Sequence, residues 1–177
     1  YVRITLTENQ DAFWSIDEFF VYKNAFPQAT PAAPTLGSLP HLSVPLLTDT
    51  ITLDGNIKEA TWQKAAQIES LSPLKDHPVT QPTQVKIFHD ANNFYISIIC
   101  HEANMDKLWE PATERDGAVW SGDDVEIYLS PGDHNDQLKY PYYQLLFSPS
   151  GVQTDLSLDA DGRSDLKWNA DWQVKTD

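Results

Sequence analysis

The side chains best suited to chemistry fall in one short run, residues 123–129, where polar and apolar types alternate. Alternate residues of a β-strand point to opposite faces, so this spacing predicts a strand with one apolar and one polar face. The apolar face, which is expected to point to a core, carries Val125, Ile127 and Leu129. The polar face, which is expected to meet solvent, carries Asp124, Glu126 and Tyr128.

A second run, residues 142–147, alternates in the same way and places Gln144 on its polar face. If the two runs pair, Gln144 joins the polar face of the first run, with Trp120 at its rim. A pyranose has an apolar CH face and a ring of hydroxyls, so it suits an aromatic plate beside carboxylate and amide groups. Trp109, in the irregular segment 102–122, is a further aromatic candidate. The alternative is that all of these are ordinary solvated residues on the wet side of a sheet.

Oxygen-bearing side chains are also dense near the end of the chain, where Asp155, Asp159 and Asp161 lie around a glycine turn. Carboxylates in such a turn are typical calcium ligands, so these three residues are candidates for a calcium site. The twelfth position counted from Ser157 is Trp168 rather than Glu, so the segment is not an EF-hand. The alternative is a polar turn without a metal.

The composition restricts the partners that the chain can bind. Lys and Arg total 12 against 26 Asp and Glu, which gives a formal net charge of -14. A field of this sign repels nucleic-acid phosphates and anionic lipid head groups, and no stretch approaches the roughly 20 apolar residues of a spanning helix. We therefore expect no nucleic-acid partner and no membrane insertion, whereas sugars and divalent cations remain suitable. The single cysteine, Cys100, lies in an apolar run and is expected to be buried.

The order of the elements indicates an all-β protein. Residues 1–24 read as two strands, because β-forming residues dominate them. Residues 25–49 contain 5 prolines and are typical of a semi-rigid linker. Residues 50–177 carry several short strand patterns between turns, with one short helix over 58–66. Two of these patterns, 84–89 and 94–101, are separated by the turn residues 90–93 and are expected to pair as a hairpin. This pattern favours an antiparallel β-sandwich of jelly-roll-like form.

A set of motifs recurs in a recognisable order along residues 50–177. In sequence these motifs are Asp54-Gly55, Trp62, Asp90, Asn93 to Ile96, Trp120 to Leu129, Tyr142 to Gln144, Pro149 to Gly151, Asp155 and Trp168. The set resembles family 9 carbohydrate-binding modules and their relatives with a DOMON-type sandwich. The resemblance implies non-catalytic binding of glucose- or xylose-based chains and structural calcium. It also implies that Trp120 stacks on the sugar and that Glu126 and Gln144 bind its hydroxyls.

The chain departs from this family at its end. The family's second stacking tryptophan and its closing strands have no counterpart before residue 177, so we expect a truncated sandwich whose natural chain continues. Residues 1–24 resemble the last strands of a discoidin-type (coagulation factor C-type) module. Two such modules in tandem imply a secreted or cell-surface bacterial protein that degrades glycans, with further domains in the same polypeptide.

Two other functions are compatible with the same residues. The first is a structural or adhesive β-domain of a surface assembly. The second is a glycoside hydrolase that uses Asp124 and Glu126, whose backbone positions would lie roughly 6.5–7 Å apart on one strand. That spacing is near the range of inverting hydrolases, but two acids on one strand cannot easily straddle a sugar ring. We therefore expect binding of an oligo- or polysaccharide without catalysis.

Overall fold

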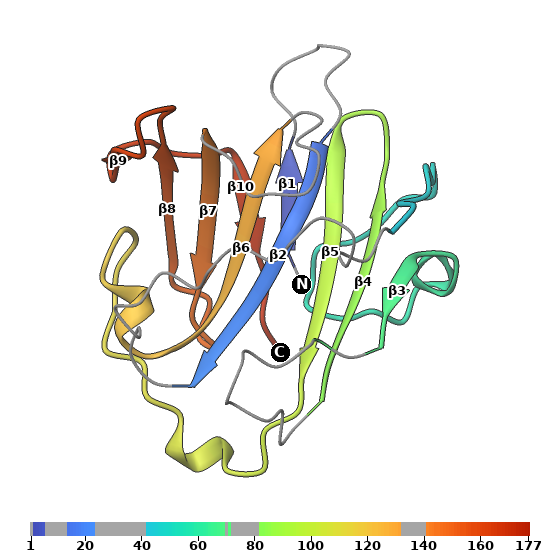
Figure 1. The fold of residues 1–177 in the computed structure, drawn as a ribbon. Helices are drawn as coiled ribbons and strands as arrows, with labels where there is room; N and C mark the ends of the chain where they lie inside the picture. Colours follow the sequence, from blue (N-terminus) through green and yellow to red (C-terminus); the bar gives the residue numbers. More distant parts are fainter. Residues whose placement is uncertain (1, 6–13, 24–41, 70, 72–81, 132–140) are drawn as a thin grey trace. The chain divides into compact units, whose positions relative to one another are not determined.

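The computed structural model describes residues 2–5, 14–23, 42–69, 71, 82–131 and 141–177, with the first two ranges described by their backbone. The described residues form two five-stranded sheets, and the paired strands in both are antiparallel (Figure 1). Helical structure within these residues is limited to 3-10 turns, none of them long or apolar enough to cross a membrane. The predicted all-β class with antiparallel sheets is therefore confirmed.

The first sheet, called sheet A, has the strand order β10-β1-β5-β4-β3. Its strands are β1 (Val2–Thr5), β3 (Ala66–Ile68), β4 (Thr83–His89), β5 (Asn93–Cys100) and β10 (Trp172–Val174). β4 and β5 form the predicted hairpin. Its turn is held by Asp90, whose Oδ1 accepts hydrogen bonds from the backbone N–H groups of Asn92 and Asn93 at 2.7 and 2.8 Å. Cys100 ends β5 and is exposed, so its predicted burial is wrong.

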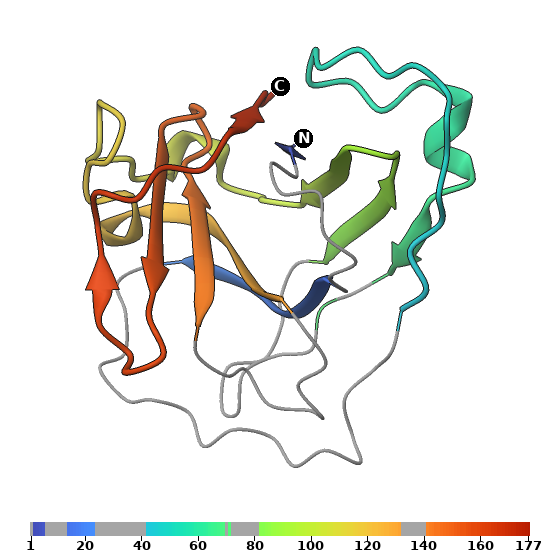
Figure 2. The same cartoon turned by 90° about the horizontal axis from the view of Figure 1, so that it is seen from above.

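An aromatic cluster forms the core beside sheet A. Trp62 and Phe88 are fully buried and meet edge to face, with ring centroids 4.9 Å apart, while Tyr95 stacks on Phe88 at 4.7 Å. Trp62 comes from the turn η2 (Ala60–Gln63), a single coiled turn directly before β3 (Figure 2). The predicted helix is therefore only this 3-10 turn, because β3 follows too closely for a longer helix.

The described part of the predicted linker 25–49, residues 42–49, is attached to sheet A. Leu47 N donates to His89 O at 2.8 Å, and His89 N donates to Pro45 O at 3.0 Å. These bonds set the chain parallel to the end of β4. This part of the linker therefore belongs to the fold, while the remainder lies outside the described residues.

The two N-terminal strands are members of these same sheets. β1 lies between β10 and β5, and β2 (Trp14–Lys23) pairs with β6. Two strands alone bury too little surface to be stable, which explains why they join larger sheets. The arrangement differs from the predicted division, in which residues 1–24 form the end of a separate discoidin-like module. The described residues divide instead into two compact units, one for each sheet.

The second sheet, called sheet B, has the order β2-β6-β7-β8-β9. Its remaining strands are β6 (Asp123–Pro131), β7 (Tyr142–Phe147), β8 (Gln153–Leu158) and β9 (Ser164–Asp165). The turn η3 (Met105–Lys107) belongs to the unit of sheet A, and the turn η4 (Val119–Ser121) to the unit of sheet B. η4 lies in the segment 108–122, which leads directly into β6.

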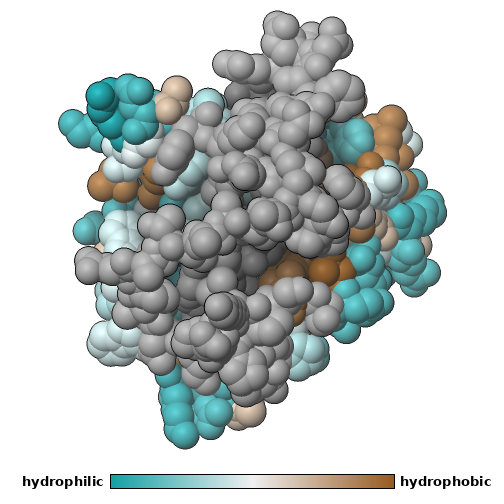
Figure 3. Space-filling view, in the orientation of Figure 1, coloured by the Kyte–Doolittle hydropathy of each residue, from teal (hydrophilic) through white to brown (hydrophobic). Residues whose placement is uncertain are grey.

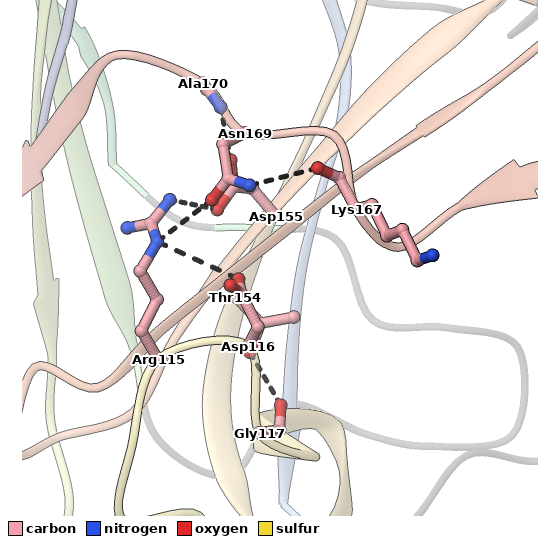
Figure 4. Close-up of polar contacts among 8 residues, drawn as sticks. All are labelled: Arg115, Asp116, Gly117, Thr154, Asp155, Lys167, Asn169 and Ala170. Atoms are coloured by element: carbon pink, nitrogen blue, oxygen red, sulfur yellow. Dashed lines mark hydrogen bonds and ion pairs between the residues drawn. The ribbon is translucent and has the colours of Figure 1, made fainter.

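An ion pair between the buried carboxylate of Asp155 and the partly exposed guanidinium of Arg115 fastens the 108–122 segment to β8. Asp155 is fully buried, and its two carboxylate oxygens accept hydrogen bonds from Arg115 Nη2 and from the backbone N–H of Ala170 (Figure 4). Arg115 Nε also donates to Asn169 Oδ1 at 3.2 Å. One carboxylate therefore joins three parts of the unit: the segment, β8 and the residues after β9.

Backbone contacts continue this attachment along the edge of β8. Asp116 N donates to Gln153 O at 2.9 Å, and Thr154 Oγ1 donates to Gly117 O at 2.6 Å. Asp116 has a φ of 62°, in the left-handed region that Asp tolerates better than most residues. The segment thus turns sharply at Asp116 while it stays bonded to the strand.

Asp155→Ala is expected to lower the free energy of unfolding by about 3 kcal/mol, because it leaves the partners of a buried charge unsatisfied. Asp161→Ala is the matched control, because Asp161 is exposed and its ion pair with Arg163, at 2.8 Å, lies on the surface. Loss of this surface pair is expected to lower the free energy of unfolding by less than about 1 kcal/mol. Urea denaturation measures both variants. Equal losses for the two would contradict the anchoring role of Asp155.

Candidate functional site

Sheet B brings together the polar residues that were predicted to share one face. β6 pairs with β7 so that Tyr128 lies opposite Gln144, which confirms the predicted pairing. The Tyr128 hydroxyl donates to Glu126 Oε2 at 2.6 Å. Gln144 Nε2 donates to the same Glu126 oxygen at 3.1 Å and to the Tyr128 hydroxyl at 2.9 Å. These three residues, called the polar trio, form a closed hydrogen-bonded group.

The prediction that this face is open to solvent is wrong. The exposed fraction is 0% for Glu126, 4% for Asp124, and 8% for both Tyr128 and Gln144. The apolar face of β6 is buried as well, as predicted from Val125, Ile127 and Leu129. Both faces of this strand are therefore covered, and its polar side chains are not ordinary solvated residues.

Part of the cover comes from η4 and the residues around it. Val119 of η4 forms a buried cluster with Leu146 and Leu156, and Trp120 packs against this cluster with its side chain half buried. Leu146 lies directly opposite Glu126 in the register of β6 and β7, so the cluster is on the same face as the polar trio. Trp120 thus lies on the predicted face, but as part of an apolar cluster rather than as a free plate.

Three carboxylate oxygens on this face have no hydrogen-bond partner among the described residues. They are Asp124 Oδ1, Asp124 Oδ2 and Glu126 Oε1, and all are shielded from solvent. A buried polar group without a partner costs on the order of 1–3 kcal/mol, and a buried charge costs more. Native proteins rarely leave such groups unsatisfied unless they have a functional role.

The shielding changes the protonation of both acids. Burial, with added repulsion from the charges of Glu126 and Asp123, raises the pKa of Asp124 to about 8. Burial also raises the pKa of Glu126, against the opposing effect of hydrogen bonds from Tyr128 and Gln144. Perturbed carboxyl groups that lie together are typical of functional sites.

Trp109 is an exposed aromatic side chain on a fixed main chain. Its side chain is 60% exposed. Its N–H donates to Asp123 Oδ2 at 2.7 Å, and its carbonyl accepts from Asp123 N at 2.7 Å. The next residue is also held, since Glu110 Oε2 accepts from Ser150 N at 2.6 Å. Because Asp123 directly precedes Asp124, these bonds hold the main chain of Trp109 at the end of β6 that carries the unpartnered acid.

Other exposed apolar side chains in the described part of this unit do not form a comparable site. Leu166, at 55% exposed, lies in the unit of sheet B but far from Trp109 in sequence. On the face shown in Figure 3, the described residues are mostly hydrophilic, and hydrophobic residues occur in separate patches. Scattered exposed apolar residues are normal, so Trp109 is distinguished by its fixed main chain and its position beside the acids.

The three calcium candidates have protein partners. Asp155 is bonded to Arg115 and Ala170. Asp159 and Asp161 are exposed; Asp159 Oδ1 accepts from the N–H of Asp161 at 2.9 Å, which is typical of a polar turn. Within the described ranges, no three Asp, Glu, His or Cys side chains gather in a metal-binding group. Calcium binding by these residues therefore stays a prediction.

Sequence reasoning missed several residues that shape the site. Nothing in the alternation pattern identifies Arg115 as the partner of Asp155, because the two are 40 positions apart. Trp168 stacks on Tyr143 with ring centroids 4.7 Å apart. Tyr143 neighbours Gln144 on β7, so this aromatic pair lies on the opposite face of sheet B from the polar trio.

Comparison with known proteins found no match among family models, curated proteins or solved structures. The resemblances read from the motifs therefore stay predictions. The functional argument rests on the geometry of this site.

The raised pKa of Asp124 predicts a stability that falls with pH. Between the ordinary value of 3.8 and about 8, the folded state holds a proton that the unfolded state has lost, so each increase in pH favours unfolding. Asp124→Asn removes this group without changing its shape. We expect this variant to match the wild-type melting temperature near pH 4 and to exceed it by about 5 °C near pH 9.

The control for this experiment is Glu114→Gln, which removes one exposed charge from the 108–122 segment. Thermal denaturation followed by circular dichroism measures all three proteins. If Asp124→Asn and Glu114→Gln respond to pH alike, Asp124 does not carry the proton.

Gly122→Ala is expected to displace Trp109. A Cβ at this position would lie 2.3 Å from Trp109 O and 2.5 Å from Pro111 Cδ, so the pairing with Asp123 must open. The expected loss is about 1–3 kcal/mol of unfolding free energy, together with a changed tryptophan emission. Thr113→Ala, an exposed change in the same segment, should alter neither quantity. Unchanged stability in Gly122→Ala would show that the contact is not tight.

Proposed function

We propose that this chain is a non-catalytic carbohydrate-binding module that takes a β-linked glucan, xylan or related glycan on the polar face of sheet B. The observation that carries the proposal is the set of unpartnered oxygens on Asp124 and Glu126, next to the polar trio. An ionised carboxylate accepts hydrogen bonds, and a protonated carboxyl group also donates one; sugar hydroxyls can pair with either form because they both donate and accept. A bound sugar would therefore remove the cost of leaving them unsatisfied.

The polar trio supports this proposal by orienting one acid. Glu126 Oε2 accepts two hydrogen bonds, from Tyr128 and Gln144, which leaves Oε1 as its open acceptor. A side chain held in this way loses little conformational freedom when a ligand binds. The carboxylate is thus oriented before the ligand arrives.

Trp109 supplies the apolar half of the proposed recognition. An exposed indole can stack on the CH face of a pyranose, and its fixed main chain limits the entropy lost on binding. The resemblance to family 9 modules assigns stacking to Trp120 instead. Because Trp120 is half buried against Leu146 and Leu156, Trp109 is the better candidate for the first contact.

The wider context belongs to the same proposal. The motifs over 50–177 support a module of a secreted or cell-surface bacterial protein that degrades glycans. In that protein the catalytic domain would lie outside this chain, and calcium would have a structural role.

A second candidate, glycoside hydrolysis, is favoured by the raised pKa of Asp124 and of Glu126. A carboxyl group that keeps its proton near neutral pH can act as a general acid. Both acids, however, project from the same face of one strand, whereas hydrolases place their acids on either side of the scissile bond. Binding without cleavage is therefore the function that the geometry supports better.

Titration with cello- and xylo-oligosaccharides, followed by tryptophan fluorescence, tests the proposal. We expect saturable binding that weakens at least about tenfold in Trp109→Ala, because the stacking surface is lost. Trp168→Ala also removes one indole, but from the opposite face of sheet B, and should leave the affinity unchanged.

The other functions give different results in the same experiment. Release of reducing sugar would support the hydrolase. Self-association without any response to sugar would support a structural or adhesive domain. An equal loss of affinity in the two tryptophan variants would contradict the proposed contact.

A further inference from the structure

The two buried acids on β6 have no cationic partner in the part of the chain that the structure describes. Among the described residues, no ion pair reaches Asp124 or Glu126, and the nearest charged neighbour in sequence is another acid, Asp123. A buried carboxylate is usually paired with a cation and hydrogen-bonded. Asp155 in the same unit is an example, because it accepts hydrogen bonds from a guanidinium and a backbone N–H. One positive charge bound on the polar face would therefore offset the negative charge that these acids carry when ionised.

The free acceptors match one type of cation. Three oxygens are unpartnered, two on Asp124 and one on Glu126. A primary ammonium group has three N–H donors and no acceptor. Charge-assisted hydrogen bonds between an ammonium and carboxylates are about twice as strong as neutral ones.

We propose that the sugar bound at this site is an amino sugar, whose free ammonium group lies between Asp124 and Glu126 and donates to their three open oxygens. This inference rests on the proposed function and specifies its ligand. The sugar ring would bring further hydroxyls to the polar trio and a CH face to Trp109.

The alternatives fit the same site less well. Neutral sugar hydroxyls can satisfy the oxygens but bring no positive charge to offset ionisation of the buried pair. Calcium takes 6–8 oxygen ligands, and two carboxylates supply too few. Burial raises the pKa of each acid because it disfavours an uncompensated negative charge, and an ammonium group that replaces the proton would supply the missing positive charge.

Both carboxyl groups are shielded in the free protein, so neighbouring side chains must move before the ammonium can reach them. Loss of that shielding is measurable as a change in tryptophan emission, because Trp120 packs on the same face. Calorimetry and fluorescence should therefore report the same binding event.

The experiment compares three β-1,4-linked trimers on the wild-type chain near pH 6, where the amine is protonated. The trimers are those of glucosamine, N-acetylglucosamine and glucose. We expect the glucosamine trimer to bind at least about tenfold more tightly than either of the others. The N-acetylated trimer replaces each cationic amine by a neutral, larger acetamido group, whereas the glucose trimer replaces it by a hydroxyl of similar size, so the two together control for charge and for size.

Two further controls separate this contact from general attraction to a chain with a net charge of -14. Tetralysine measures non-specific binding of a cation that carries no sugar. Asp124→Asn should reduce the preference for glucosamine to about that of the N-acetylated trimer, whereas Glu114→Gln should leave the preference unchanged.

The outcomes distinguish this inference from the function on which it rests. If the glucose trimer binds as tightly as the glucosamine trimer, the amino-sugar inference is overturned while carbohydrate binding stands. If no trimer binds, both are overturned. If tetralysine matches the glucosamine trimer and Asp124→Asn alters neither, the attraction is non-specific and the inference fails. The ligand comparison on the wild-type chain decides the matter even if Asp124→Asn does not fold.

Discussion

Burial of a carboxylate has one of the largest free-energy costs in folding, because the protein must replace the hydration that the charge loses. The unit of sheet B buries three such groups and treats them differently. Asp155 receives a guanidinium and a backbone N–H. Glu126 is half satisfied by Tyr128 and Gln144, and the Asp124 carboxyl group has no hydrogen-bond partner among the described residues. This contrast within one unit supports the proposal that Asp124 and Glu126 bind a ligand.

The 108–122 segment connects the ion-paired Asp155 to the two acids for which we propose a ligand. At Arg115 it is tied to Asp155, and at η4 it covers part of the polar face. Near its start it holds Trp109 exposed through the pairing with Asp123. One irregular segment therefore packs an apolar cluster on the face that carries the acids and holds an exposed aromatic residue at the start of β6. Favourable contacts elsewhere in the described fold must offset the free-energy cost of burying these acids with unpartnered oxygens.

Much of the fold could be predicted from local patterns. Alternation in residues 123–129 and 142–147 predicted two strands, and their pairing places Tyr128 opposite Gln144 as expected. A turn at Asp90 predicted the hairpin of β4 and β5. These strands and turns depend on residues that are close in sequence, so the alternation of polar and apolar residues is enough to predict them.

The burial of the site could not be predicted in the same way. Alternation shows which residues share a face, but not whether a distant segment covers that face. The cover here includes Val119 and Trp120, in a stretch without any period. The joining of β1 to β5 likewise depends on long-range pairing, which no local pattern in residues 1–24 reveals. The ion pair of Arg115 with Asp155 belongs to the same class of tertiary contact.

Asp124 is a buried acid without a hydrogen-bond partner among the described residues, and we propose that a ligand supplies that partner. Carbon-13 NMR of chains labelled at the carboxyl groups of Asp and Glu measures this directly, as a titration of each group with and without sugar. The account predicts one aspartate that titrates near the pKa of about 8 in the free chain and whose chemical shift changes when the ligand is added. Titration of every carboxyl group near its ordinary value, with no change on adding sugar, would contradict the account.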